Sequence, residues 1–88
     1  MIVVVTKQFE KDVRKELSKS NQQQLAGILE KLQEANSIKE VSNIKKLKGY
    51  KSAYRARMGD YRIGFILEGN VVKLSRIMHR SEIYKYFP

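Results

Sequence analysis

With 88 residues the chain has the length of one domain, and it contains no cysteine and a single histidine. These counts exclude a disulfide framework and argue against structural zinc, and a chain this short buries only a modest core. We therefore expect no metal and no cofactor. The hydrophobic content of 42% suits a folded domain, and the net charge is +9. The apolar start MIVVV is too short for a signal-peptide core or a membrane span, so a cytoplasmic protein without membrane contact is expected.

The positive charge is concentrated in the second half of the chain. Residues 1–44 carry seven basic and six acidic side chains, whereas residues 45–62 carry seven basic side chains and one acidic one. Residues 73–88 add four basic side chains and one acidic one. A charge that served only solubility would be spread along the chain. Concentrated positive charge indicates a polyanionic partner, either a nucleic acid or an acidic protein.

Hydrophobic periodicity predicts a strand and two helices in the first half of the chain. The β-branched run Ile2–Val5 is typical of a strand. From Lys7 the period becomes helical, which predicts one amphipathic helix to about Lys19. Ser20 and Gln23 have the spacing of a capping box and predict a second helix to about Asn36, antiparallel to the first. The apolar stripes are Phe9, Val13 and Leu17 in the first helix and Leu25, Ile28, Leu29 and Leu32 in the second.

Three strands are predicted in the second half, after a polar connector over residues 37–50. They span residues 52–58, 61–67 and 71–78, and tight-turn sequences separate them. Residues 81–87 can add a short helical turn. The order βααβββ predicts a single α+β domain over residues 1–88, with the helices on one face of a small, mainly antiparallel sheet.

The hairpin around Gly59-Asp60 determines which side chains share a face. A two-residue loop pairs Arg57 with Arg62 and Arg55 with Gly64, and opposed residues share a face. The three arginines then form one face, and Gly64 leaves a gap opposite Arg55 in which a nucleotide could lie. The other face is apolar and must meet the helices: it holds Tyr54, Ala56, Met58, Tyr61, Ile63 and Phe65.

Like charges opposed across two strands destabilise a sheet, so Arg57 opposite Arg62 is a local cost with no structural reason in the sequence. Such local conflicts tend to mark function. The alternative is an exposed strand face whose arginines are solvated or partly paired with Glu68.

Alternation along the last strand places Lys73, Ser75 and His79 on the arginine face, with His79 nearest Arg62. The same alternation places Met78 on the core face. Arg76 also falls on the core face, which the alternation does not explain unless the side chain extends from a sheet margin.

The stretch from Leu47 to Pro88 resembles the C-terminal half of RelE/ParE-family toxins from bacterial type II toxin–antitoxin systems. Four motifs match that family in order, namely Leu47-Lys48-Gly49, Tyr54-Arg55-Ala56-Arg57, Gly59-Asp60-Tyr61-Arg62, and His79-Arg80 followed by Tyr84. RelE-type members of the family have a fold similar to microbial ribonucleases and cleave mRNA in the ribosomal A site. The resemblance implies the same fold and activity for this chain.

The resemblance also implies roles for individual residues. Arg55 and Arg57 match the basic pair that grips the scissile phosphate, and Arg62 matches the arginine that stabilises the transition state. Arg80 matches a basic residue near the leaving group, and Tyr84 an aromatic residue that stacks on the substrate.

Cleavage by a 2′-hydroxyl needs no metal, but it needs a proton acceptor. Histidine changes its charge near neutral pH, so we predict that His79 takes or gives a proton in the reaction, and the sequence leaves open which residue is the general base. The alternative is that His79 ends the strand and forms a hydrogen bond with the backbone. We expect Tyr86 and Phe87 to anchor the tail. Five lysines in the second half of the chain are expected to contact ribosomal RNA: they are Lys45, Lys46, Lys48, Lys51 and Lys73.

The sequence therefore predicts a toxin that acts as a metal-independent, ribosome-dependent mRNA endoribonuclease. A cognate acidic antitoxin would hold it silent in a hetero-oligomer, and the free toxin would be a monomer. Two alternatives remain open, a ParE-like inhibitor of DNA gyrase without nuclease activity and an inert homologue that acts only in operator-binding repression.

Overall fold

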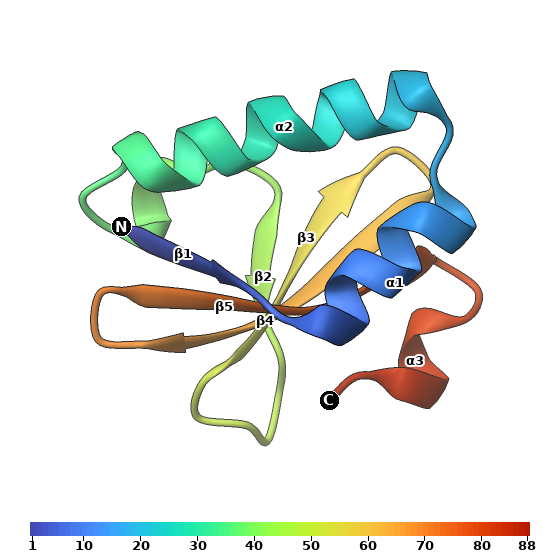
Figure 1. The fold of residues 1–88 in the computed structure, drawn as a ribbon. Helices are drawn as coiled ribbons and strands as arrows, with labels where there is room; N and C mark the ends of the chain where they lie inside the picture. Colours follow the sequence, from blue (N-terminus) through green and yellow to red (C-terminus); the bar gives the residue numbers. More distant parts are fainter.

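The computed structural model describes all residues, 1–88, and confirms the α+β fold class. The sheet has five strands in the order β1-β5-β4-β3-β2, and only the β1–β5 pair is parallel. Helices α1 and α2 lie on one side of the sheet (Figure 1). The short α3 follows β5, and its Ile83 packs against Met78 of that strand. No helix is both long and apolar enough to cross a membrane. The elements are β1 (Ile2–Val5), α1 (Lys7–Glu16), α2 (Lys19–Glu34), the 3-10 helix η1 (Ile38–Glu40), β2 (Ile44–Lys46), β3 (Ala53–Met58), β4 (Tyr61–Glu68), β5 (Val71–His79) and α3 (Ile83–Tyr86).

One strand was not predicted. The connector contains β2, which pairs antiparallel with β3 and places Ile44 opposite Ala56 and Lys45 opposite Arg55. Three residues are too few to show a period, and β2 becomes visible only through its pairing with β3. The element order is therefore βααβββ with one additional edge strand before the predicted hairpin.

The break between the helices falls earlier than predicted. Ser18, not Ser20, caps α2, because its hydroxyl accepts a hydrogen bond from the N–H of Asn21. Helix α1 ends at Glu16, so only Leu17 and Ser18 separate the two helices. Ser20 has a capping-box neighbour at the right spacing but lies inside the helix, which shows that this motif alone does not place a helix start.

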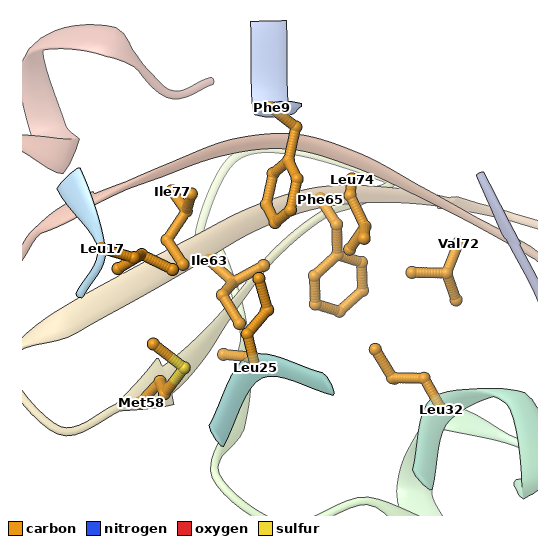
Figure 2. Packing of buried hydrophobic residues seen from close by; sticks show 11 residues of the cluster. Phe9, Leu17, Leu25, Leu32, Met58, Ile63, Phe65, Val72, Leu74 and Ile77 are labelled. Atoms are coloured by element: carbon orange, nitrogen blue, oxygen red, sulfur yellow. The ribbon is translucent and has the colours of Figure 1, made fainter. Parts of the chain in front are cut away.

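The main core fills the space between the two helices and the sheet (Figure 2). Phe9 from α1, Leu17 directly after it, and Leu25 and Leu32 from α2 point at the apolar face of the hairpin, as predicted. A second, smaller core lies on the opposite face of the sheet. It consists of Ala53, Met78, Ile83 and Phe87, with Leu47 and Ile66 packed against it.

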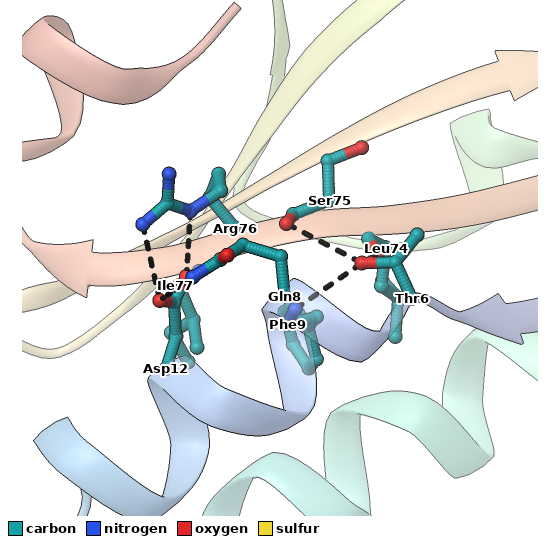
Figure 3. A network of polar contacts seen from close by, with 8 residues as sticks. All are labelled: Thr6, Gln8, Phe9, Asp12, Leu74, Ser75, Arg76 and Ile77. Atoms are coloured by element: carbon teal, nitrogen blue, oxygen red, sulfur yellow. Dashed lines mark hydrogen bonds and ion pairs between the residues drawn. The ribbon is translucent and has the colours of Figure 1, made fainter.

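Helix α1 is attached to β5 by polar contacts at its N-cap and near its middle (Figure 3). Thr6 caps α1 by accepting from the N–H of Phe9, and its hydroxyl donates to the carbonyl of Leu74 at 2.8 Å. Further along, the buried carboxylate of Asp12 accepts from Nε of Arg76 at 2.8 Å and from the N–H of Ile77 at 3.1 Å. Strand β1 pairs with β5 only as far as Leu74, so Asp12 satisfies a strand N–H that no strand covers.

These contacts perturb both ionisable groups of the pair. Burial raises the pKa of Asp12, but hydrogen bonds from Arg76, from the N–H of Ile77 and from Gln8 lower it by more, so the net pKa lies below the usual range. The hydrogen bond to Asp12 raises the pKa of Arg76. The pair is therefore charged at all physiological pH values.

Candidate active site

The hairpin register is the predicted one, with Arg57 opposite Arg62 and Arg55 opposite Gly64. Each of the two opposed guanidinium groups has its own acceptor. Arg62 Nη1 donates to the carbonyls of Gly59 at 2.8 Å and Tyr61 at 2.9 Å. Arg57 Nη2 donates to Oδ1 of Asn43 at 3.3 Å. Both arginines keep further N–H donors for a ligand, because a guanidinium carries five.

The C-terminal segment brings an arginine and a tyrosine to the same place. The N–H of Arg80 donates to the carbonyl of Asp60 in the hairpin turn at 2.8 Å, which joins the end of β5 to the tip of the β3–β4 hairpin. Helix α3 follows, and its buried Ile83 fixes the turn on which Tyr84 stands. The guanidinium carbon of Arg55 lies 4.7 Å from the centre of the Tyr84 ring. Tyr84 is 74% exposed, so the ring is open to a stacking partner.

These residues line a cleft of 480 Å³, and we call it the arginine cleft. It contains five cations and no carboxylate, so it favours an anion. Lys45 enters it because β2 pairs with β3 and places Lys45 beside Arg55. The lining residues are Asn43, Ile44, Lys45, Arg55, Ala56, Arg57, Arg62, Arg80 and Tyr84.

The gap predicted at Gly64 does not exist, because the ring of Phe87 fills it. A Cβ at position 64 would lie 2.5 Å from both Cγ and Cδ2 of that ring. Phe87 is the buried anchor that the sequence predicted, whereas Tyr86 is exposed and faces the guanidinium of Arg76. Glycine is therefore required at this position for packing of the tail, not for access of a nucleotide.

The predicted position of His79 is wrong because β5 contains a β-bulge. Phe65 pairs with Leu74 and Gly64 with Arg76, so Ser75 is an extra residue and the alternation reverses beyond it. His79 consequently lies opposite Tyr61, on the face away from Arg62. Its Nδ1 accepts from the N–H of Ser81 at 3.2 Å, which was the alternative interpretation. His79 does not line the arginine cleft.

The bulge also corrects the other side chains placed by alternation. Met78 lies opposite Arg62 and is buried in the second core instead of the main one. Arg76 lies at the edge of β5 that β1 does not cover, and its ion pair with Asp12 accounts for a charged residue at this position.

The predicted RNA-binding lysines do not form one surface. Lys45 lines the arginine cleft, whereas Lys46 lies opposite Tyr54 and therefore has the other parity. Lys48 and Lys51 are exposed on the loop between β2 and β3. Lys73 is exposed between Val4 and Ile66, away from the hairpin tip.

Asn43 was not predicted as part of the site, and Lys45 was predicted only as an RNA contact, without its place in the arginine cleft. Asn43 has a φ of 64° and accepts the N–H of Arg57 at its carbonyl, so it both ends the pairing of β2 and holds the Arg57 side chain. The alternation of Ile44 and Lys45 could have placed Lys45 on the arginine face, but only if residues 44–46 had been recognised as a strand.

No three histidine, aspartate or glutamate side chains gather anywhere in the structure in a way that could hold a metal ion.

The fold and the cleft define a small α+β protein that presents a carboxylate-free cluster of arginines at the end of a mainly antiparallel sheet. Comparison with known proteins identifies its family. The family described as the ParE toxin of type II toxin-antitoxin systems matches residues 3–84. The chain therefore belongs to the RelE/ParE family of toxins, as its motifs predicted.

Individual relatives agree with this assignment. Toxin RelE3 of Methanocaldococcus jannaschii is 39% identical, and the match covers 100% of both chains. A RelB-RelE antitoxin-toxin complex from Methanococcus jannaschii contains a chain that is 38% identical, with a TM-score of 0.82 over 97% of this chain and 99% of that one. A chain of the archaeal RelE-RelB complex from Pyrococcus horikoshii is 26% identical, with a TM-score of 0.74 over 90% and 93% of the two chains.

Proposed function

We propose that the protein is a RelE-type toxin that cleaves mRNA on the ribosome. The observation that carries the proposal is the arginine cleft, which five cations and the exposed Tyr84 line and which contains no carboxylate. Arginine holds phosphate oxygens through two parallel N–H donors, and aromatic rings stack on the unpaired bases of single-stranded RNA. A protein that inhibits only by binding another protein needs neither feature.

The reaction is attack of a ribose 2′-oxygen on the adjacent phosphorus. The P–O5′ bond breaks, and the products are a 2′,3′-cyclic phosphate and a 5′-hydroxyl end. Arg55 and Arg57 hold the non-bridging oxygens, and Arg62 neutralises the charge that grows on them in the transition state. Arg80 approaches from the other wall, at the leaving oxygen, and Tyr84 stacks on a neighbouring base.

Two protons move in this reaction, and arginine does not give up its own near neutral pH. Arg80 neutralises the charge on the leaving 5′-oxygen, and water supplies the proton that this oxygen takes up. The proton of the 2′-hydroxyl then passes to water in the open cleft. Because His79 lies outside the cleft, it takes no part in this scheme.

The proposal includes an acidic antitoxin as the partner. The relatives from Methanococcus jannaschii and Pyrococcus horikoshii were both solved as complexes of RelE with RelB. A chain with a net charge of +9 attracts a partner whose acidic residues carry the opposite charge. Free toxin is expected to be a monomer in the cytoplasm, and the neutralised form a hetero-oligomer.

Expression without a partner tests the function. Incorporation of labelled amino acids should fall before incorporation of labelled thymidine, and Arg57→Ala together with Arg62→Ala should abolish the arrest. Purified toxin on ribosomes programmed with a defined mRNA should produce fragments whose 3′ ends are cyclic phosphates and whose 5′ ends need a kinase before ligation. Arrest of DNA synthesis first, with gyrase-dependent breaks and intact mRNA, would replace this proposal with the ParE-like one.

A further inference from the structure

A second groove continues the arginine cleft toward α2. It has a volume of 660 Å³ and shares Asn43, Arg57, Arg62 and Arg80 with the cleft. It passes the hairpin turn at Gly59 and Asp60 and ends at the α2 residues Gln24, Gly27, Ile28 and Lys31. The two spaces therefore meet at the arginines, with Tyr84 at one end and α2 at the other.

The glycine on the groove wall has no structural reason. Gly27 lies near the middle of α2, where glycine costs about 1 kcal/mol relative to alanine. Its backbone does not have a positive φ, and an added Cβ would meet no atom within 4 Å. Neither the backbone nor the packing of the protein itself requires glycine at this position. What the glycine preserves is empty space in the groove, which points to a ligand that approaches the helix backbone.

The chemistry of the groove differs from that of the cleft. It carries four cations, Lys31 and the three shared arginines, against the single carboxylate of Asp60, so it also favours an anion. It contains no aromatic side chain. Its neutral polar groups, Gln24, Ser42 and Asn43, can donate and accept hydrogen bonds, which is how a base edge is distinguished, whereas stacking on Tyr84 tolerates any base.

We propose that this groove is a second nucleotide subsite. Building on the nuclease function proposed above, the arginines hold the scissile phosphate, the nucleotide on one side of it stacks on Tyr84, and the nucleotide on the other side lies in the groove against Gly27. Gln24 and Ser42 line the groove but not the arginine cleft, so they determine the part of any base preference that comes from this second nucleotide.

A pair of matched substitutions tests the subsite. Gly27→Gln puts a side chain into the groove, whereas Ala26→Gln puts the same side chain on the neighbouring exposed position of α2, which does not line it. Both variants should fold, and Gly27→Gln should melt at a higher temperature than the parent because glycine is the poorer helix former. On programmed ribosomes, Gly27→Gln should lose between about 10- and 100-fold in kcat/KM, the effect of displacing a substrate near the reacting atoms, while Ala26→Gln stays at the parental value.

Binding can be measured without cleavage by using a trinucleotide with a 2′-O-methyl group on every ribose. In nitrogen–proton correlation spectra it should shift the amide signals of Gly27 and Lys31 in the parent protein but not in Gly27→Gln. A Gly27→Gln variant that cleaves as fast as Ala26→Gln would overturn the subsite and leave the groove to another occupant, such as an acidic protein partner. A parent protein that cleaves no mRNA would overturn the nuclease proposal and the subsite with it, so the two failures are distinguishable.

Discussion

Replacement of Gly64 by alanine should detach the tail that completes the arginine cleft. The added Cβ would lie 2.5 Å from two ring atoms of Phe87 and 2.9 Å from a third, well inside van der Waals contact. The ring cannot move aside easily, because it is only 6% exposed and packs with Ala53, Met78 and Ile83. Either the second core is overpacked or Phe87 leaves it, and the segment that carries Arg80 and Tyr84 then loses one of its two buried anchors, the other being Ile83.

The size of the effect follows from these two outcomes. Overpacking a core typically costs about 1–3 kcal/mol, and exposing a buried phenylalanine costs about 1.5–3 kcal/mol. For a domain of this size, 1 kcal/mol shifts the melting temperature by roughly 4–8 °C. Gly64→Ala should therefore lower Tm by roughly 4–24 °C in thermal unfolding followed by circular dichroism. Cleavage should fall as well, because Tyr84 no longer stays beside Arg55.

A double-mutant cycle with Phe87→Ala isolates the contact. Without the ring, Gly64→Ala should be neutral or stabilising, because glycine within a strand is worse than alanine by roughly 0.5–1 kcal/mol. A coupling energy near zero, or a Gly64→Ala protein with the parental Tm and activity, would refute the conclusion that Phe87 occupies this position.

Three further predictions concern charged and titrating groups. Arg62→Ala should lower the cleavage rate by about 10²–10³-fold, the usual cost of removing one donor to the transition state. Its Tm should hold or rise, because the repulsion between Arg62 and Arg57 is relieved. Lys73→Ala on the same ribosomes is the control, and equal losses in the two variants would contradict a special role for Arg62. His79→Gln should lose far less than the roughly 10²–10⁴-fold expected for a general base, and its pH–rate profile should match the parental one; a flattened profile would restore the acid–base role. The pKa of Asp12 is lowered in the folded protein, so its stabilising charge is fully present above the unfolded pKa of about 3.9 and is lost as pH falls through the lower folded value. Asp12→Asn should remove this loss of stability in acid, which sets in as the pH falls below the usual pKa of the carboxyl group, and denaturant titrations at several pH values would measure it. The substitution should cost up to about 3 kcal/mol at pH 7, because the partner Arg76 stays partly solvated. An unchanged acid dependence would contradict the assignment.

The sequence alone was sufficient for the elements whose signals are local. The hydrophobic period predicted β1, both long helices and the three long strands within a few residues, because each element has an apolar face that repeats along the chain. The Gly59-Asp60 turn determined the hairpin register, and with it the shared face of Arg55, Arg57 and Arg62. The Arg57–Arg62 conflict was also visible at this level, and it led to the cleft.

Features that depend on pairing or packing could be decided only by the tertiary structure. The extra residue at Ser75 has no signature in the sequence, yet it reverses every side chain beyond it and moves His79 away from the arginines and Met78 into the second core. Strand β2, which brings Lys45 into the cleft, is too short to show a period and exists because β3 offers it an edge. Gly64 reads as open space in a strand, but the tail returns from the far end of the chain to fill it. The alternation of side chains along a strand is a local property, so the sequence alone indicated which side chains could share a face. The pairing register between strands depends on distant residues, so only the tertiary structure decided which of those side chains lie together.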